Sequence, residues 1–324
     1  MTKAMNSKDT EHDVVVVGAG AAGLNAALLL GRARRNVVVV DAGAPRNAPA
    51  AHMHGYLSRD GLPPSTLLEL GRAEIARYGV RLVRARVDEI EPGPSAWQDG
   101  EIGFSVRLEG GPVLGARRLL VATGLYDELP AIPGVREQWG KDVLHCPYCH
   151  GHEVGDRPLA VLGTHPRAVH QALLLRQWSD DVVFLAHTLD LTPADRDRLE
   201  ARGLRIVEGP IDHLVVEDGR LRGVELADGR VLPRAAVFLF PRMVPNDRLL
   251  TRLGCEKDDA GWVVTDRTGR TSVPGVWAAG NVVDPRAQVV TAAGMGAAAA
   301  FAVNADLVDE EVRHAVERRR APAR

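Results

Sequence analysis

The sequence is poor in aromatic residues and cysteines, and its charges nearly cancel. Aromatic side chains make up 4% of the 324 residues, too few to expect a stacking surface for single-stranded nucleic acid. A net charge of -2 gives no electrostatic reason to expect nucleic acid or an anionic membrane as a partner. Of the three cysteines, two form a single CxxC pair, which excludes the disulfide framework of a small secreted protein.

The sequence also lacks a recognisable leader and a long apolar run. The first residues, MTKAMNSKDTEHD, are polar and partly acidic, unlike a signal or transit peptide. The longest apolar stretch, GMGAAAAFAVNA, is short and rich in alanine, which favours a packed helix over a membrane span. We therefore expect a soluble, cytoplasmic protein, and a chain of this length ordinarily forms two domains.

Residues 13–43, DVVVVGAGAAGLNAALLLGRARRNVVVVDAG, have the pattern of a strand, a glycine turn, a helix and a second strand. Gly18, Gly20 and Gly23 fit G-x-G-x-x-G, which gives a tight turn, backbone approach to a pyrophosphate and close helix packing. Asp41 ends the second strand, where a carboxylate can accept hydrogen bonds from ribose hydroxyls. Glycines and acid together predict a dinucleotide site.

A second segment, far along the chain, can complete this site. Residues 275–300, GVWAAGNVVDPRAQVVTAAGMGAAAA, predict a short strand, a glycine turn and a helix. The N-terminus of such a helix can lie against the negatively charged part of a bound cofactor.

Three stretches, VVVVGAGAAGLNAA, LLVATG and GVWAAGNV, together resemble the flavoproteins with two dinucleotide-binding domains. The chain length resembles the low-molecular-weight thioredoxin reductase branch, and the resemblance covers nearly the whole chain. It implies an α/β fold with two Rossmann-like domains and a homodimer. The implied FAD domain comprises residues 1–125 and 243–324, with the CxxC in a central domain of residues 126–242 and hinges near ATGLYDELP and FPRMVPND.

The resemblance further implies that the first fold binds FAD, with help from the ATG and AGN segments. Asn281 stands where the family usually has aspartate, so it can make polar contacts but carries no charge. The predicted cofactor-binding residues are Gly18, Gly20, Ala22, Gly23, Asp41, Ala42, Thr123, Gly124, Gly280, Asn281, Gln288 and Val289.

The central domain contains an internal copy of the first fold, because LGTHPRAVHQALLL aligns without gaps with VGAGAAGLNAALLL. The aligned pairs are Gly18 with Gly163, Gly20 with His165, Gly23 with Ala168, and Asp41 with Ala186. The imidazole of His165 would occupy the place of a pyrophosphate, and AHTLDLTP lacks the arginine pair that thioredoxin reductases use for NADPH. NADP(H) binding is therefore doubtful, although contacts from Arg167 or Arg176 leave it open.

The stretch HCPYCHGHE admits a redox disulfide, a zinc site or a haem attachment sequence. Haem attachment is disfavoured because such cytochromes are exported, and no metal site is predicted because Cys146, Cys149, His150 and His152 crowd together without distant ligands. The pair precedes the second fold, where the resembled family carries its redox disulfide. Pro147 and a following helix favour an N-terminal turn that lowers the thiol pKa, although an inert pair remains open.

The histidine that directly follows the second cysteine gives a CxxCH pattern, which resembles that of the flavin-dependent dithiol oxidases of gliotoxin, holomycin and related natural products. The resemblance assigns Cys146 to the mixed disulfide with substrate and Cys149 to electron exchange with the flavin. His150 suits a base near neutral pH, although it could instead cap a turn. His52 and His54 could line the substrate pocket or satisfy hydrogen bonds of their loop.

These patterns favour an FAD-dependent dithiol oxidase that closes a disulfide in a small molecule and passes electrons to O2. The first alternative is a thioredoxin reductase-like disulfide reductase fed by NADPH or another electron donor. The second is a non-catalytic sensor that binds flavin or metal, which would not turn over dithiols.

Overall fold

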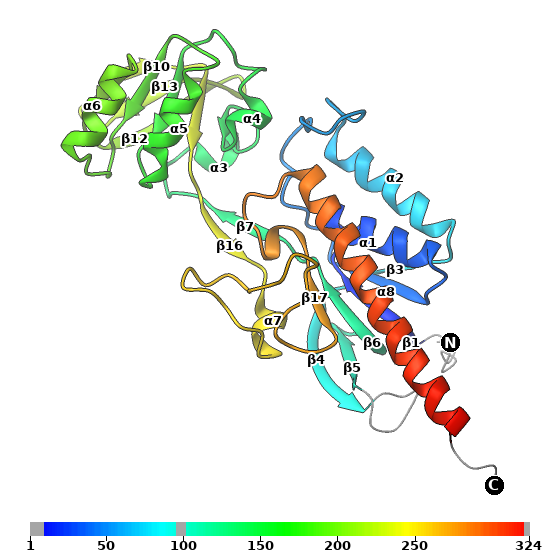
Figure 1. The fold of residues 1–324 in the computed structure, drawn as a ribbon. Coiled ribbons are helices and arrows are strands. Elements are labelled where there is room, and N and C mark those ends of the chain that lie inside the picture. Colours follow the sequence, from blue (N-terminus) through cyan, green and yellow to red (C-terminus); the bar gives the residue numbers. More distant parts are fainter. Residues whose placement is uncertain (1–9, 95–101, 321–324) are drawn as a thin grey trace. The chain divides into compact units, whose positions relative to one another are not determined.

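The computed structural model describes residues 10–94 and 102–320, so most of the N-terminal stretch judged for a leader lies outside it. The chain forms two compact units (Figure 1). The first unit takes its described residues from 1–45, 65–126 and 245–324. The central unit comprises residues 46–64 and 127–244.

The first unit is built on a mixed sheet whose parallel half matches the predicted dinucleotide fold. The order along the sheet is β3-β2-β1-β6-β5-β4, and β17 also pairs with β6. β1, β2, β3 and β17 run parallel in their pairings, whereas β4 and β5 form an antiparallel extension. The strands are β1 (Glu11–Val17), β2 (Val37–Asp41), β3 (Arg81–Arg84), β4 (Val87–Pro94), β5 (Ile102–Leu108), β6 (Val113–Val121) and β17 (Val276–Ala278).

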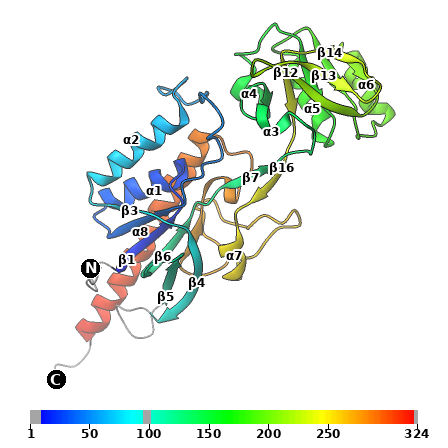
Figure 2. The same ribbon diagram turned by 180° about the vertical axis from the view of Figure 1, so that it is seen from behind.

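Two helices from opposite ends of the chain, α1 (Ala21–Arg32) and α8 (Val289–Arg320), lie side by side in this unit (Figures 1 and 2). They approach closely because Gly296 has no side chain, and a Cβ there would lie 2.1 Å from the carbonyl oxygen of Ala22. Asn25 donates a hydrogen bond of 2.7 Å to the carbonyl of Ala293. The unit also contains α2 (Pro64–Ala76), α7 (Arg248–Arg252) and the 3₁₀ turn η2 (Gly280–Val282).

By length and composition alone, α8 could cross a membrane, with a mean hydropathy of 1.3 over its most apolar window. The alanine-rich run alone is too short to predict such a stretch, because the window also includes other residues of the same helix. Core helices of folded domains pass the same test. One face of α8 is buried here, and its buried residues include Ala292, Ala299, Val303 and Leu307.

The central unit has a parallel sheet of order β11-β10-β9-β15-β8, with α5 and α6 following β9 and β10. A small antiparallel sheet, β12-β13-β14, completes it, and β7 pairs with β16 where the chain passes between the units. The elements are β7 (Leu125–Glu128), α3 (Val135–Gln138), β8 (Val143–Leu144), α4 (Pro147–His150), β9 (Leu159–Leu162), α5 (Arg167–Leu175), β10 (Val182–Leu185), α6 (Pro193–Ala201), β11 (Arg205–Val207), β12 (Ile211–Glu217), β13 (Arg220–Leu226), β14 (Val231–Pro233), β15 (Ala236–Leu239) and β16 (Arg242–Pro245).

The predicted α/β architecture with two Rossmann-like folds is confirmed, since β9-α5-β10 repeats β1-α1-β2 in the predicted alignment. The division of the chain differs from the predicted one at residues 46–64, which group with the central unit rather than with the FAD domain. Arg46 forms a two-pronged ion pair with Asp127, with nitrogen–oxygen distances of 2.8 Å. Gly140 leaves room for Pro49, whose Cβ would lie 2.7 Å from an added side-chain carbon. These contacts tie the segment to the central unit.

Candidate active site

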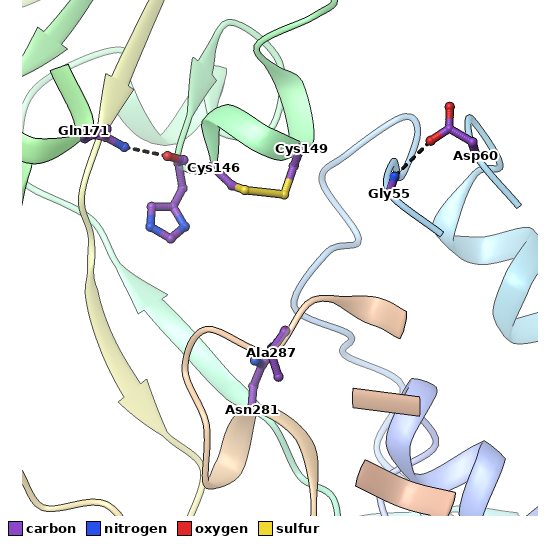
Figure 3. The surroundings of a disulfide bond; sticks show 8 residues. Gly55, Asp60, Cys146, Cys149, Gln171, Asn281 and Ala287 are labelled. Carbon is purple, nitrogen blue, oxygen red and sulfur yellow. Dashed lines mark hydrogen bonds between the residues drawn. A yellow bond between two sulfur atoms is a disulfide. The ribbon is translucent and has the colours of Figure 1, made fainter. Parts of the chain in front are cut away.

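Cys146 and Cys149 are joined by a disulfide at the start of α4 (Figure 3). Their Cα atoms are 5.2 Å apart, and the backbone N–H groups of Cys149 and His150 both donate to the carbonyl of Cys146. Pro147 opens the helix, where its missing N–H costs no hydrogen bond. The turn that the sequence predicted around the CxxC is therefore present.

Gly151 lets this turn pack against the ring of Trp178. A Cβ at Gly151 would lie 2.8 Å from that ring, so a side chain there would push α4 away. Tyr148 meets the same ring edge to face, with centroids 5.7 Å apart, and keeps 66% of its surface exposed. The indole thus fixes the orientation of the CxxC turn.

His150 ends α4, one residue beyond Cys149. Burial lowers the pKa of its imidazole, Glu153 acts to raise it, and His54 acts to lower it. Because burial is the largest of these effects, the ring is held in its neutral form at neutral pH. A neutral imidazole beside a disulfide can accept the proton of an incoming thiol.

His145 precedes Cys146 and lies deeper in the unit. Burial lowers its pKa to about 4, with a smaller effect in the same direction from Arg46. Its ring meets Phe240 edge to face at 5.0 Å, and its carbonyl accepts a hydrogen bond of 2.5 Å from Gln171 (Figure 3). Gln171 also donates to the carbonyl of Leu239, so it fixes the end of β8 against β15 just before the CxxC.

Of the two histidines that could line the substrate pocket or satisfy hydrogen bonds of their loop, His54 lies in a network of polar side chains. Its Nδ1 lies 3.3 Å from Asp60 and its Nε2 lies 3.4 Å from Glu153, in the turn after α4. Asp60 also accepts a hydrogen bond of 2.9 Å from the backbone of Gly55. His52 is exposed.

In the first unit, the predicted glycines have the geometry that a dinucleotide requires. Gly18 has a positive φ of 103°, and a Cβ there would lie 2.4 Å from the carbonyl of Ala122. A Cβ at Gly23 would lie 1.9 Å from the carbonyl of Gly18. A Cβ at Gly20, by contrast, would meet no protein atom within 4 Å. The glycines close the turn on one side and leave bare backbone on the other, which fits a pyrophosphate.

The remaining predicted cofactor residues converge on the same end of the sheet. The Asp41 carboxylate accepts a hydrogen bond of 3.1 Å from the N–H of Ala19, which holds it beside the glycine turn. Gly280 has a positive φ of 80°, and a Cβ there would lie 3.1 Å from Ala22. Thr123 donates to the carbonyl of Asn246 at 2.7 Å, and Gly124 has a positive φ of 69°. Ala42 follows β2, Gln288 precedes α8 and Val289 begins it. These residues fit FAD.

The hydrogen bonds of Asn281 account for an asparagine at this position, where aspartate was expected. Its amide nitrogen donates hydrogen bonds of 2.9 Å to the carbonyls of Asp284 and Ala287 (Figure 3). A carboxylate has no hydrogen to donate to these carbonyls. Asparagine therefore stabilises the loop that leads into α8.

The second dinucleotide fold is closed at the corresponding position. The Nδ1 of His165 accepts a hydrogen bond of 3.1 Å from the backbone N–H of Arg167, at the start of α5. The imidazole stacks on Phe240 with centroids 4.9 Å apart, and the Arg167 guanidinium lies 5.6 Å above the same ring. A side chain of the protein thus uses an N–H that a pyrophosphate would use. These residues do not fit NADP(H).

Arg176, the other cation considered for NADPH, serves the fold instead. It donates hydrogen bonds to the carbonyls of Arg202 and Ser179 and pairs with Asp180 at 2.9 Å. Ala186 occupies the position of the ribose-binding acid and is buried.

The family model for pyridine nucleotide-disulphide oxidoreductases matches residues 12–297. The chain belongs to this family. Membership of this family implies that the chain binds the flavin FAD. The glycine turn of the first unit agrees with this. The chain is a thioredoxin reductase-like oxidoreductase, and the resemblance to flavoproteins with two dinucleotide-binding domains is confirmed.

Relatives from this family cover nearly the whole chain. Thioredoxin reductase sirT of Leptosphaeria maculans is 33% identical over 317 residues, covering 90% of this chain and 93% of that protein. The crystal structure of HlmI shares 64% identity with a TM-score of 0.92, covering 95% of this chain and 96% of that one. The structure of putative thioredoxin reductase TrxB from Bacillus anthracis shares 33% identity with a TM-score of 0.86, covering 93% and 99%.

Within residues 10–94 and 102–320 of this family member, no group of three or more histidines, cysteines or acids could hold a metal ion. Sequence reasoning missed Glu153 and Asp60, which surround His54, and Phe240, which receives His145 and His165. Glu153 lies in the quoted CxxC stretch three residues after His150, a spacing that could have signalled it. Asp60 and Phe240 carried no local signal.

Proposed function

We propose that this protein is an FAD-dependent dithiol oxidase that closes an intramolecular disulfide in a small molecule and uses O2 as the final electron acceptor. The observation that carries the proposal is the contrast between an intact CxxC with a neutral histidine and a nicotinamide fold closed by His165. Electrons then enter through the cysteines. A homodimer and a cytoplasmic location belong to the same proposal.

The chemistry begins at Cys146, the cysteine that the family resemblance assigns to the substrate. Neutral His150 takes the proton of one substrate thiol, and the thiolate attacks the Sγ of Cys146. The bond to Cys149 breaks and Cys149 leaves as a thiolate. The second substrate thiol attacks the substrate sulfur of the mixed disulfide and displaces Cys146, whose departing thiolate takes that thiol's proton. The substrate loses two electrons, which the two cysteines gain.

Gly18, Gly20 and Asp41 would hold FAD through the bare backbone turn and the carboxylate described above. When bound, FAD would supply the acceptor for the electron pair of the reduced cysteines and a route to O2. The protein's own contribution is to bind the dinucleotide, to hold the CxxC turn against Trp178 and to accept the thiol proton at His150.

A disulfide reductase is the second candidate, favoured by relatives that are named thioredoxin reductases. It requires NADPH or another donor to deliver electrons to the flavin. The arrangement of His165, Arg167 and Phe240 opposes NADPH as that donor. A non-catalytic sensor would show no turnover with dithiols.

The deciding experiment is an anaerobic flavin titration. NADPH, then NADH, is added to the purified holoprotein while the flavin absorbance is followed, and dithiothreitol is added afterwards. The oxidase requires that both nicotinamides leave the flavin oxidised, that the dithiol bleaches it, and that air restores it. Prompt bleaching by either nicotinamide would instead establish the reductase.

A further inference from the structure

The loop of residues 52–62 is closed on itself and holds His54 in a fixed place. Met53 donates to the carbonyl of Leu62 at 3.0 Å, and Gly61 donates to the carbonyl of Met53 at 2.9 Å. Asp60 accepts the backbone hydrogen bond from Gly55, which together with His54 lowers the pKa of this carboxyl group. Asp60 is therefore charged at neutral pH, and the loop presents the His54 ring to Glu153.

A carboxylate faces each ring nitrogen of His54. Asp60 lies 3.3 Å from Nδ1, and Glu153 lies 3.4 Å from Nε2. Carboxylates only accept hydrogen bonds, whereas a neutral imidazole has one donor nitrogen and one acceptor nitrogen. The His54 ring therefore joins the two carboxylates. We call Asp60, His54 and Glu153 the carboxylate bridge.

The bridge ends on the segment that carries the CxxC histidine. Glu153 follows His150 by three residues and acts to raise its pKa, whereas His54 acts to lower it. Other titratable groups of this region include His145, before the CxxC, and His152, whose charge also acts on Asp60, together with Tyr148 of α4 and His52, Tyr56 and Arg59 of the loop. Glu153 therefore acts on two histidines at once.

We propose that the carboxylate bridge positions Glu153 so that its carboxylate favours the protonated form of His150 when that ring takes a proton from a substrate thiol. His54 is a positioning residue in this scheme, because it acts through Glu153 and His150 rather than on the sulfur atoms. The inference rests on the proposed function in assigning His150 as the acceptor of the thiol proton.

The test measures the titration of His150 directly, in oxidised holoprotein labelled with ¹³C in its histidine rings. Carbon–proton NMR spectra across pH, assigned with His150→Gln, report the midpoint of each ring. Glu153→Gln is expected to lower the His150 midpoint by about 0.5 to 1 pH unit, and His54→Gln to raise it by a similar amount. His52→Gln, which alters an exposed neighbour, is the matched control and should leave it nearly unchanged.

The same variants are then reduced anaerobically with dithiothreitol at each pH. The acid limb of the flavin reduction rate should follow the NMR midpoints in both directions, which a loss of local structure would not produce. The inference is overturned if the His150 midpoint does not change, or if it moves in the same direction in Glu153→Gln and His54→Gln. It is also overturned if the acid limb of the flavin reduction rate does not follow the midpoint. If the midpoints move as expected but dithiothreitol leaves the wild-type flavin oxidised, the proposed function fails while the coupling stands.

Discussion

The two dinucleotide folds of this protein share a strand–helix–strand pattern. They differ at the turn between the first strand and the helix, and at the end of the second strand. In the first fold, bare Gly20 faces space that no protein atom fills, and Asp41 is held beside the turn by Ala19. In the second, His165 folds back onto α5 and Phe240, and Ala186 replaces the acid. A Rossmann-like core thus persists without the residues that usually contact its nucleotide, because strand and helix packing depend on other residues.

The largest expected effect comes from replacing His150, beside the CxxC of the central unit. His150→Gln should slow anaerobic flavin reduction by dithiothreitol about 100- to 10,000-fold, because the thiol loses its general base. In the wild type, reduction should fall as the pH drops through a midpoint below 6.5, since the lowered pKa keeps the ring neutral above it. Stopped-flow absorbance measures both, and the FAD content should be unchanged. A variant of wild-type speed would remove His150 from the mechanism.

Gly20→Ala tests the open side of the first fold. The new Cβ meets no protein atom, so the fold should keep its thermal stability, but the backbone could no longer approach a pyrophosphate. We expect the FAD dissociation constant to rise about 100-fold, as for the loss of charge-assisted hydrogen bonds worth about 3 kcal/mol. Fluorescence titration of the apoprotein gives the constant. Gly294→Ala is the control, because Gly294 is an exposed residue of α8 where an added Cβ also meets no protein atom within 4 Å. Unchanged affinity would contradict the assignment.

Asp41→Asn tests the acid that distinguishes the two folds. Asparagine can still accept the hydrogen bond from Ala19, so the turn should survive while the charge on the ribose contact is lost. FAD should bind about tenfold more weakly, a loss of about 1.4 kcal/mol. The same titration measures it. The reciprocal change, Ala186→Asp, should not create NADPH-dependent bleaching, and bleaching there would mean that the acid alone separates the folds.

The smallest effect is expected from opening the second fold. His165→Gly removes the imidazole, but the ribose acid and the paired arginines are still missing. NADPH should therefore bind with a dissociation constant of about 1 mM or weaker, and flavin reduction by NADPH should stay negligible. Isothermal titration and anaerobic absorbance provide the measurements. Efficient reduction in this variant would show that one side chain separates an oxidase from a reductase.

The local patterns of the chain predicted the order of its elements well. Gly18 and Gly23 could be placed from sequence because only glycine fits a turn that packs a helix against its own strand. The gapless repeat predicted that the second fold would fail to bind a nucleotide in the usual way, and His165 stands at the predicted position. The assignment of residues 46–64 could not be predicted, because the ion pair of Arg46 with Asp127 joins residues 81 apart in the chain.

The sequence by itself determined the two folds, the disulfide pair and the difference between a glycine and a histidine at the nucleotide position. Each depends on neighbours within a few residues or on a repeated pattern. Only the tertiary structure decided what surrounds His54 and what His165 does, since Asp60, Glu153 and Phe240 come from separate segments. A side chain's charge state depends on burial and on such neighbours, and folding alone brings these together.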